Sequence, residues 1–308
     1  MLAVFTIIIL LLILAIGIFF NMSMWRHGIN TMGIGSGGEK SPWARYSHLI
    51  DAGMSWFFSK ELEEREIVSY DGLKLKACYL PAEGANTTII LMHGYRSKDL
   101  FDFSCIYRMY YELGYNLLVP YQRAHGKSQG QLIYFGVKER YDCASWCEYV
   151  SQTAPEQDIV IEGMSMGATT VLMAAGLKLP QQVRGVIADC GFNTPYDVME
   201  STMRRWGIPA RPYLDLMALV TKLIGFDMRT STEDSLKNCR LPVLLIHGTK
   251  DKIVPYEMSV RNKNACAGEC TLVTVEGAGH GTSYMLEPDR CVDALQSFLK
   301  KYCKAKDE

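Results

Sequence analysis

Residues 158–175 constrain the fold of this chain more than any other stretch. They begin with a β-branched run at residues 159–161, which is typical of a buried strand. The pentapeptide Gly-Met-Ser-Met-Gly follows at residues 163–167, and small and apolar residues that favour a buried helix come after it. The two glycines permit a very sharp turn, because a side chain at either place would collide with the neighbouring strand and helix. The stretch therefore predicts a strand, a tight turn and a helix in direct succession.

Ser165, at the centre of that turn, is a candidate nucleophile. A serine on such a turn has a strained backbone that exposes its hydroxyl above the edge of the sheet. The helix that follows directs its positive end and its first N–H groups toward the same place. The alternative is a glycine-rich turn with a solvated serine. The strand before the turn and the helix after it favour the nucleophile.

The rest of the chain alternates between predicted strands and helices. Residues 66–70 and 73–80 form a predicted hairpin around the dipeptide Asp71-Gly72. The other predicted strands cover residues 88–92, 115–120, 183–189, 243–246 and 271–275, and the predicted helices cover residues 101–113, 137–153, 257–264 and 288–302. An antiparallel start followed by this alternation predicts an α/β fold, with a mostly parallel sheet and helices on both faces.

Residues 192–241 depart from the alternation and predict a small helical cap. Their apolar side chains include Met199, Met203, Trp206 and Met217. Methionine-rich surfaces adapt to varied apolar ligands, which suits an acyl chain. We nevertheless expect most of these side chains to pack the cap onto the core.

A serine hydroxyl needs a neighbouring base, and the base needs a carboxylate that holds it. His280 is the candidate base, because it lies in a glycine-rich loop after the final predicted strand, where ligand-facing residues of such sheets collect. Asp251, in the loop after the preceding strand, is the candidate carboxylate. Asp189, at the end of an earlier strand, is its rival.

Negative charge that develops on a substrate oxygen requires fixed donors. We expect one donor to be the backbone N–H of Met166, directly after the candidate nucleophile. The second should come from the loop after residues 88–92, where Tyr95 follows His93-Gly94.

The N-terminus predicts a membrane anchor. Residues 2–20 are an apolar run, and no charge appears before Arg26, so the run has about the length that spans a bilayer. A cleaved signal peptide is the rival interpretation, but it would need a basic start and an apolar core of only about 7–15 residues. Arg26, Lys40 and Arg45 follow the run and none precedes it, which favours a cytoplasmic position for the rest of the chain.

These features divide the chain into three predicted parts. Residues 1–24 are a single-pass transmembrane anchor, and residues 25–62 hold a linker and an amphipathic helix, which we expect to pack on the domain rather than lie in the membrane interface. Residues 63–308 form the main domain, with its cap at about 192–241.

Composition excludes some classes of function. The chain has 32 basic and 33 acidic residues and a net charge of −1, so nothing indicates a nucleic-acid partner. The ten cysteines are scattered, and the pairs Cys143/Cys147 and Cys266/Cys270 lack further ligands at metal-binding spacing. We therefore predict no metal and no cofactor. A disulfide remains open if the domain is exported.

Five motifs in order resemble the α/β-hydrolase superfamily: His93-Gly94, residues 123–128, residues 163–167, residues 248–251 and His280. The pattern is most similar to the serine aminopeptidase-like branch, which includes monoacylglycerol lipase-like and lysophospholipase-like members. The resemblance covers residues 66–302. Ala124 departs from it, since relatives often carry glycine there, and the His-Gly-Gly-Gly run of another lipase branch is missing.

The resemblance implies the catalytic order Ser165, Asp251, His280 and an α/β-hydrolase fold. It implies a membrane-anchored serine hydrolase that cleaves an ester or related acyl bond through an acyl-enzyme, with a small acylated molecule or a lipid as substrate. One alternative is a serine aminopeptidase-like peptidase, which would need an acidic group to hold the amino terminus of the substrate; the sequence does not place Glu162 or Asp189 in that role. A second alternative is a non-catalytic ligand-binding protein on this fold. The natural substrate and the oligomeric state stay open.

Overall fold

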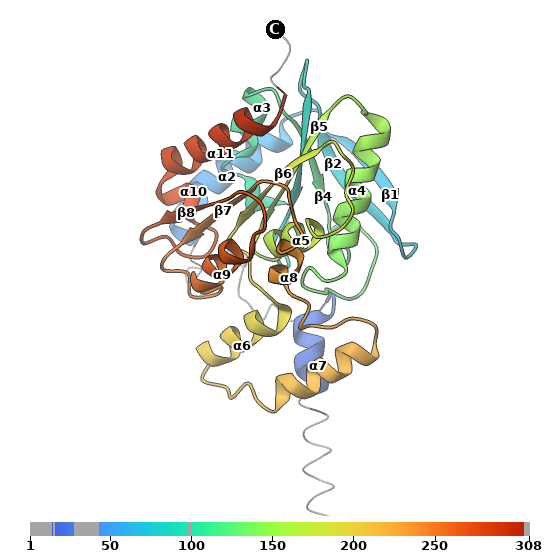
Figure 1. Ribbon diagram of the computed structural model, residues 1–308, viewed down its shortest axis with the longest axis vertical. Coiled ribbons are helices and arrows are strands. Elements are labelled where there is room, and N and C mark those ends of the chain that lie inside the picture. The colour runs from blue at the N-terminus through green and yellow to red at the C-terminus, as the bar shows by residue number, and fades with distance from the viewer. Residues whose placement is uncertain (1–13, 15, 28–42, 98–99, 305–308) are drawn as a thin grey trace, which may run out of the picture.

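The computed structural model describes residues 14, 16–27, 43–97 and 100–304. At its centre is an eight-stranded sheet in the order β1-β2-β4-β3-β5-β6-β7-β8 (Figure 1). The strands are β1 (Glu63–Val68), β2 (Lys74–Leu80), β3 (Thr87–Met92), β4 (Asn116–Pro120), β5 (Asp158–Met164), β6 (Val183–Asp189), β7 (Val243–Gly248) and β8 (Cys270–Val275). β2 pairs antiparallel with β1 and β4, and the other neighbours are parallel. The predicted, mostly parallel α/β sheet is thus confirmed.

Helices cover both faces of the sheet, as the alternation predicts. They are α2 (Ser47–Phe58), α3 (Tyr107–Glu112), α4 (Glu139–Thr153), α5 (Met166–Ala174), α6 (Pro195–Arg205), α7 (Tyr213–Leu223), α8 (Thr232–Leu236), α9 (Glu257–Ala265), α10 (Ser283–Leu286) and α11 (Pro288–Tyr302). The fully buried strand β3 divides its side chains between two cores. Ile89 and Leu91 pack in the core beneath α2, α3 and α11, whereas Ile90 and Met92 pack in the core beneath α4, α5 and α8. This alternation follows from the two-residue period of a strand.

The cap is formed by α6 and α7, between β6 and β7, and lies at one end of the molecule (Figure 1). Met199, Met203 and Met217 are buried in the same core as the domain, as expected for side chains that attach the cap. Trp206 and Leu223 are exposed.

Most predicted elements agree with the structure to within two residues, and two differ more clearly. The first strand begins earlier and ends at Val68, because the turn is longer than two residues. Ser69 closes it by accepting a hydrogen bond from the Leu73 N–H and donating one to the Asp71 carboxylate. The helix predicted at residues 101–113 is two shorter pieces, a 3₁₀ turn at Phe101–Phe103 and α3.

Part of the N-terminal prediction lies outside the described residues, namely most of the anchor and the linker. Residues 16–24 are helical. Nowhere in the described ranges does a helix have the length and apolarity to cross a bilayer. The amphipathic helix is α2, preceded by a 3₁₀ turn at Ala44–Tyr46. It packs on the domain, with the buried ring of Phe57 stacked on Tyr107 at 4.2 Å between centroids.

Candidate active site

Ser165 lies between β5 and α5, at the turn that the glycine pattern predicts. Its backbone angles, φ 55° and ψ −114°, belong to a sparsely populated region, which stores strain. The crowding expected at the two glycines is present. A Cβ on Gly167 would overlap the carbonyl of Met92, and one on Gly163 would overlap the backbone of Gly167. The sequence forms this turn because only glycine fits at both places.

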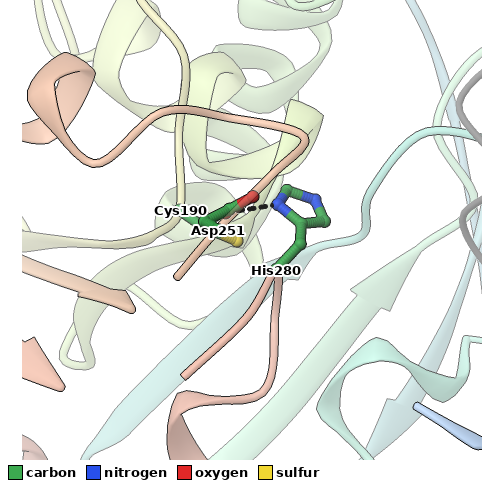
Figure 2. Close-up of side chains that lie close together, drawn as sticks. All are labelled: Cys190, Asp251 and His280. Atoms are coloured by element: carbon green, nitrogen blue, oxygen red, sulfur yellow. Dashed lines mark hydrogen bonds and ion pairs between the residues drawn. The ribbon is translucent and has the colours of Figure 1, made fainter. Parts of the chain in front are cut away.

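The structure brings Ser165, His280 and Asp251 together from three distant parts of the chain. The Oγ of Ser165 lies 2.9 Å from Nε2 of His280, and Nδ1 of His280 lies 2.7 Å from Oδ2 of Asp251. Figure 2 shows the second contact, with the imidazole pointing at the carboxylate. A carboxylate only accepts hydrogen bonds, so Nδ1 carries the proton and Nε2 is free to accept the proton of the serine. All three side chains are buried.

Asp251 is held as a carboxylate by several donors. Its Oδ1 accepts the backbone N–H groups of Ile253, at 2.8 Å, and Val254, at 2.9 Å. Nε2 of His247 lies 3.2 Å from Oδ2, while Nδ1 of His247 lies 2.6 Å from Oγ of Ser259. Burial alone would raise the pKa of Asp251, but His280 and the hydrogen bonds from both histidines outweigh it and hold this pKa below its usual range.

The loop that carries His280 is fixed by residues that sequence reasoning missed. The indole Nε1 of Trp43 donates to the backbone oxygen of His280 at 2.5 Å. The ring also lies against Gly281, where φ is 61° and an added Cβ would be 2.7 Å from it. Tyr284, in α10 directly after this loop, points its hydroxyl at Glu162 in β5 at 3.4 Å. Trp43 is one of several helix-spaced apolar residues in the sequence, and nothing local marks it as a partner of the loop.

The expected oxyanion donors belong to two segments that adjoin Ser165. Met166 begins α5, where the first N–H groups have no acceptor within the helix. Gly94, which precedes Tyr95, packs directly on the serine, since a Cβ built on it would lie 3.5 Å from Cβ of Ser165. The placement is compatible with two converging backbone donors. Their role in stabilising an oxyanion stays a prediction.

His93 and His125 support the loop that contains Gly94 and Tyr95. His93 donates from Nδ1 to the Gly94 oxygen at 2.8 Å and accepts from the Gln122 N–H at 3.0 Å. His125 accepts the N–H of Arg96 at Nε2, at 3.0 Å. Burial, the repulsion from His93 if that ring were also charged, and the positive charges of Arg96 and Arg26 keep the pKa of His125 well below its usual range, so its neutral form, which can accept, is favoured.

The rival carboxylates Asp189 and Glu162 do not contact His280. Both are buried. Burial raises the pKa of Glu162 to about 8, against hydrogen bonds from Tyr110 and Tyr284. Burial, with the charges of Asp251 and Glu162, raises the pKa of Asp189 well above its usual range. Burial thus favours the protonated, uncharged form of both groups.

Cys190 lies beside the Asp251–His280 pair, and the three potential metal ligands are within 4.8 Å of one another (Figure 2). Their geometry suits a proton better than a metal ion. A tetrahedral zinc would hold its nitrogen and oxygen ligands roughly 3.3 Å apart, whereas Nδ1 of His280 and Oδ2 of Asp251 are 2.7 Å apart. All ten cysteines carry free thiols.

Known proteins share this architecture. The model of the family described as TAP-like protein matches residues 224–304. YqkD of Bacillus subtilis (strain 168), itself uncharacterized, is 27% identical over 256 residues, which cover 81% of this chain and 84% of YqkD. The esterase Pf2001 of Pyrococcus furiosus has a TM-score of 0.65 at 22% identity, covering 81% of this chain and 94% of the esterase. Est1E of Butyrivibrio proteoclasticus, solved with ferulic acid, has a TM-score of 0.59 at 21% identity, covering 77% and 98%.

The structural likeness, at these levels of identity, shows the fold. The chain has the α/β-hydrolase fold, and the comparisons support placing it in the α/β-hydrolase superfamily.

Proposed function

We propose that this protein is a serine hydrolase that cleaves an ester or related acyl bond through an acyl-enzyme. The observation that carries the proposal is the position of the His280 ring, with one nitrogen 2.9 Å from the Ser165 hydroxyl and the other 2.7 Å from the Asp251 carboxylate. This arrangement is the one that activates a serine at neutral pH.

Each side chain has a defined step in the proposed reaction. Ser165 attacks the acyl carbonyl while Nε2 of His280 takes its proton, and His280 then returns that proton to the leaving alcohol. Asp251 keeps Nδ1 protonated and stabilises the imidazolium that forms. The backbone N–H groups of Tyr95 and Met166 bind the developing oxyanion. Water, activated by the same histidine, then releases the acid and restores the serine.

An ester or acylated substrate is favoured by the cap. A cavity of about 280 Å³ lies between the N-terminal helix and the cap. Its lining residues are Ile16, Phe19, Met203, Ile208, Pro209, Tyr213 and Met217. An apolar cavity of this kind suits a hydrocarbon chain. Structural neighbours that are named as esterases support the same class of substrate.

The peptidase alternative, which belongs to the aminopeptidase-like branch, loses its expected acidic group. A carboxylate that holds the substrate's amino terminus must be ionised, whereas burial favours the protonated form of both Glu162 and Asp189. A non-catalytic binding protein does not require a serine, a base and a carboxylate in hydrogen-bond contact, so that alternative does not account for the arrangement of Ser165, His280 and Asp251.

We further propose that the enzyme is attached to a membrane by residues 2–20, with the main domain on the cytoplasmic side. The proposal rests on the apolar sequence of that segment and on the positive residues after it. Anchoring would place the cap close to lipid or acylated molecules.

Substrate screening tests this function. Detergent-solubilised full-length protein is assayed with p-nitrophenyl acetate, octanoate and laurate and with aminoacyl p-nitroanilides. The proposal predicts hydrolysis of the esters and a loss of at least about 10³-fold in Ser165→Ala. A clear preference for the anilides would transfer support to the peptidase. Folded wild-type protein that hydrolyses neither class would favour the binding protein.

A further inference from the structure

Residues 22–26, at the end of the N-terminal helix, are integrated into the main domain. Ser23 and Met24 are buried. The Met24 oxygen accepts the N–H of Ile133 at 2.7 Å, and the N–H of Arg26 donates to the Gln131 oxygen at 2.7 Å. Trp25 forms an antiparallel bridge with Leu132, the residue between Gln131 and Ile133. The segment therefore pairs with the domain through its backbone as an additional short strand would.

The same segment contacts the loop that provides the expected second oxyanion donor. The hydroxyl of Tyr95 donates to the Ser23 oxygen at 2.8 Å. The Arg96 guanidinium donates from Nη2 to the Trp25 oxygen at 2.5 Å and to the Met22 oxygen at 3.2 Å. The last carbonyls of a helix have no acceptor role within it, so they need donors from elsewhere. Here those donors come from residues 94–97, which we call the oxyanion loop. Arg96 also brings a positive charge to the negative end of the helix.

Arg26 makes a second connection, to the loop at residues 123–128 and the residues after it. Its guanidinium donates to the backbone oxygens of Gly126 at 2.6 Å, Ser128 at 2.7 Å and Gly130 at 3.4 Å. His125, within that loop, accepts the backbone N–H of Arg96. Residues 22–26 therefore reach Arg96, the residue after Tyr95, in two ways: directly through its side chain, and through the loop that holds its backbone N–H.

We propose that residues 22–26 are a positioning element of the active site, which holds the oxyanion loop so that the N–H of Tyr95 faces the reacting carbonyl. The inference rests on the proposed function and extends it, because it makes catalysis depend on the membrane-proximal segment. The loop needs such support: it is irregular after β3, and Arg96 has a left-handed φ of 52°. Several hydrogen bonds from outside the loop replace the support that regular structure would give.

Two variants of the full-length protein remove single connections. Tyr95→Phe removes the hydroxyl that donates to Ser23 and keeps the backbone N–H and the ring, which stacks on Phe135 with centroids 5.0 Å apart. Arg26→Met removes the three hydrogen bonds that Arg26 donates to backbone oxygens within residues 126–130, and Arg26→Lys restores a cation there. Lys127→Met is the matched control, because Lys127 lies in the same loop but pairs with Glu64.

Ester hydrolysis and amide hydrogen exchange are measured on all four variants. We expect kcat to fall about fivefold in Tyr95→Phe, the effect of one lost neutral hydrogen bond. We expect a fall of tenfold to about 10²-fold in Arg26→Met, the range for a misplaced catalytic group. KM should stay within about twofold, since uniform binding is untouched. Arg26→Lys should recover part of the rate, and exchange at residues 94–97 should accelerate in step with each loss.

The outcomes separate this inference from the proposed function. A wild type that hydrolyses no ester defeats the proposed function, and unchanged exchange at residues 94–97 in Arg26→Met then also overturns the positioning role. A wild type that hydrolyses esters, together with wild-type kcat in Tyr95→Phe and Arg26→Met, overturns the positioning role alone. Equal losses in Lys127→Met would do the same.

Discussion

The imidazole of His280 has its two nitrogens on different partners, and the partner at Nδ1 decides what the other nitrogen can do. Asp251 accepts from Nδ1 at 2.7 Å, so Nε2 is left to accept the serine proton. Asp251 is itself fixed by two backbone N–H groups and by His247. A carboxylate so placed both selects the tautomer and stabilises positive charge on the ring.

Replacing Asp251 by asparagine should therefore lower kcat by about 10³- to 10⁴-fold, because the amide favours the wrong tautomer of His280. Asp189→Asn is the matched control. Burial already favours the uncharged form of Asp189, so its amide is close to isosteric and should leave kcat within about threefold. Ester hydrolysis measures both variants, and circular dichroism checks that both are folded. A greater loss in Asp189→Asn would assign the role to the rival residue.

Glu162 makes stability depend on pH. Its pKa of about 8 in the folded protein lies above the ordinary value of 4.5, so the folded state keeps a proton that the unfolded chain releases. As the pH rises from about 4.5 to about 8, the free energy of unfolding should then fall by up to about 1.4 kcal/mol per pH unit. Glu162→Gln mimics the protonated acid and should lose this component. Denaturation from about pH 5 to about pH 9 tests it: parallel curves for the two proteins would contradict the account.

At the scale of elements, the turn between β5 and α5 decides where the proposed reaction would take place. The carbonyl of Met92 from β3 occupies the space where Gly167 would carry a side chain. β3 and the helix thus approach as closely as backbone permits, and the oxyanion loop that follows β3 lies beside Ser165 for that reason.

Gly167→Ala should destabilise the protein by about 3 kcal/mol or more, because the clash is with backbone that no side-chain rotation relieves. Gly17→Ala is the control, since no described atom beyond its chain neighbours and its own helix lies within 4 Å of the added methyl group. Its free energy of unfolding should stay within about 0.5 kcal/mol of the wild type. Thermal unfolding in detergent measures both. Equal melting temperatures for Gly167→Ala and wild type would show that the turn is less crowded than described.

At this scale, the sequence could predict features that depend on a short local pattern or on the order of the motifs along the chain. The strand before Ser165, the glycines around it and the loops after the last two strands carry recognisable patterns, and the structure brings the residues on them together. The hydrogen bond from Trp43 to His280 joins residues 237 positions apart, and the bonds from Tyr95 and Arg96 reach residues 22–25. Such contacts depend on side-chain and backbone groups meeting after folding, so no pattern in the sequence indicates them.

At the scale of the whole molecule, the N-terminal helix packs against both the cap and the loop beside the candidate catalytic groups. Ile16 and Phe19 line the apolar cavity with the cap, and residues 22–26 bind the oxyanion loop a few residues later. The exposed apolar side chains of α7, among them Leu219 and Leu223, lie on the same cap. A hydrocarbon chain in that cavity would touch both the N-terminal helix and the cap.

The anchor should keep the full-length protein in the membrane fraction after an alkaline carbonate wash, because about 20 apolar residues are inserted in the bilayer. A variant with Leu10→Arg and Leu12→Arg should be released, since each charge at the centre of a spanning helix costs about 2.5–3.5 kcal/mol. Fractionation followed by immunoblotting compares the two proteins. Release of the wild type would contradict the proposed attachment.

Labelling with a fluorophosphonate tests the central claim most directly, because the probe bonds covalently to a serine only when a neighbouring base activates it. Full-length wild type and Ser165→Ala are treated in parallel, and the modified peptide is identified by mass spectrometry. The account predicts the probe on Ser165 in the wild type and no labelling of the folded variant. Folded wild-type protein that stays unlabelled, or that carries the probe on another serine, would contradict it.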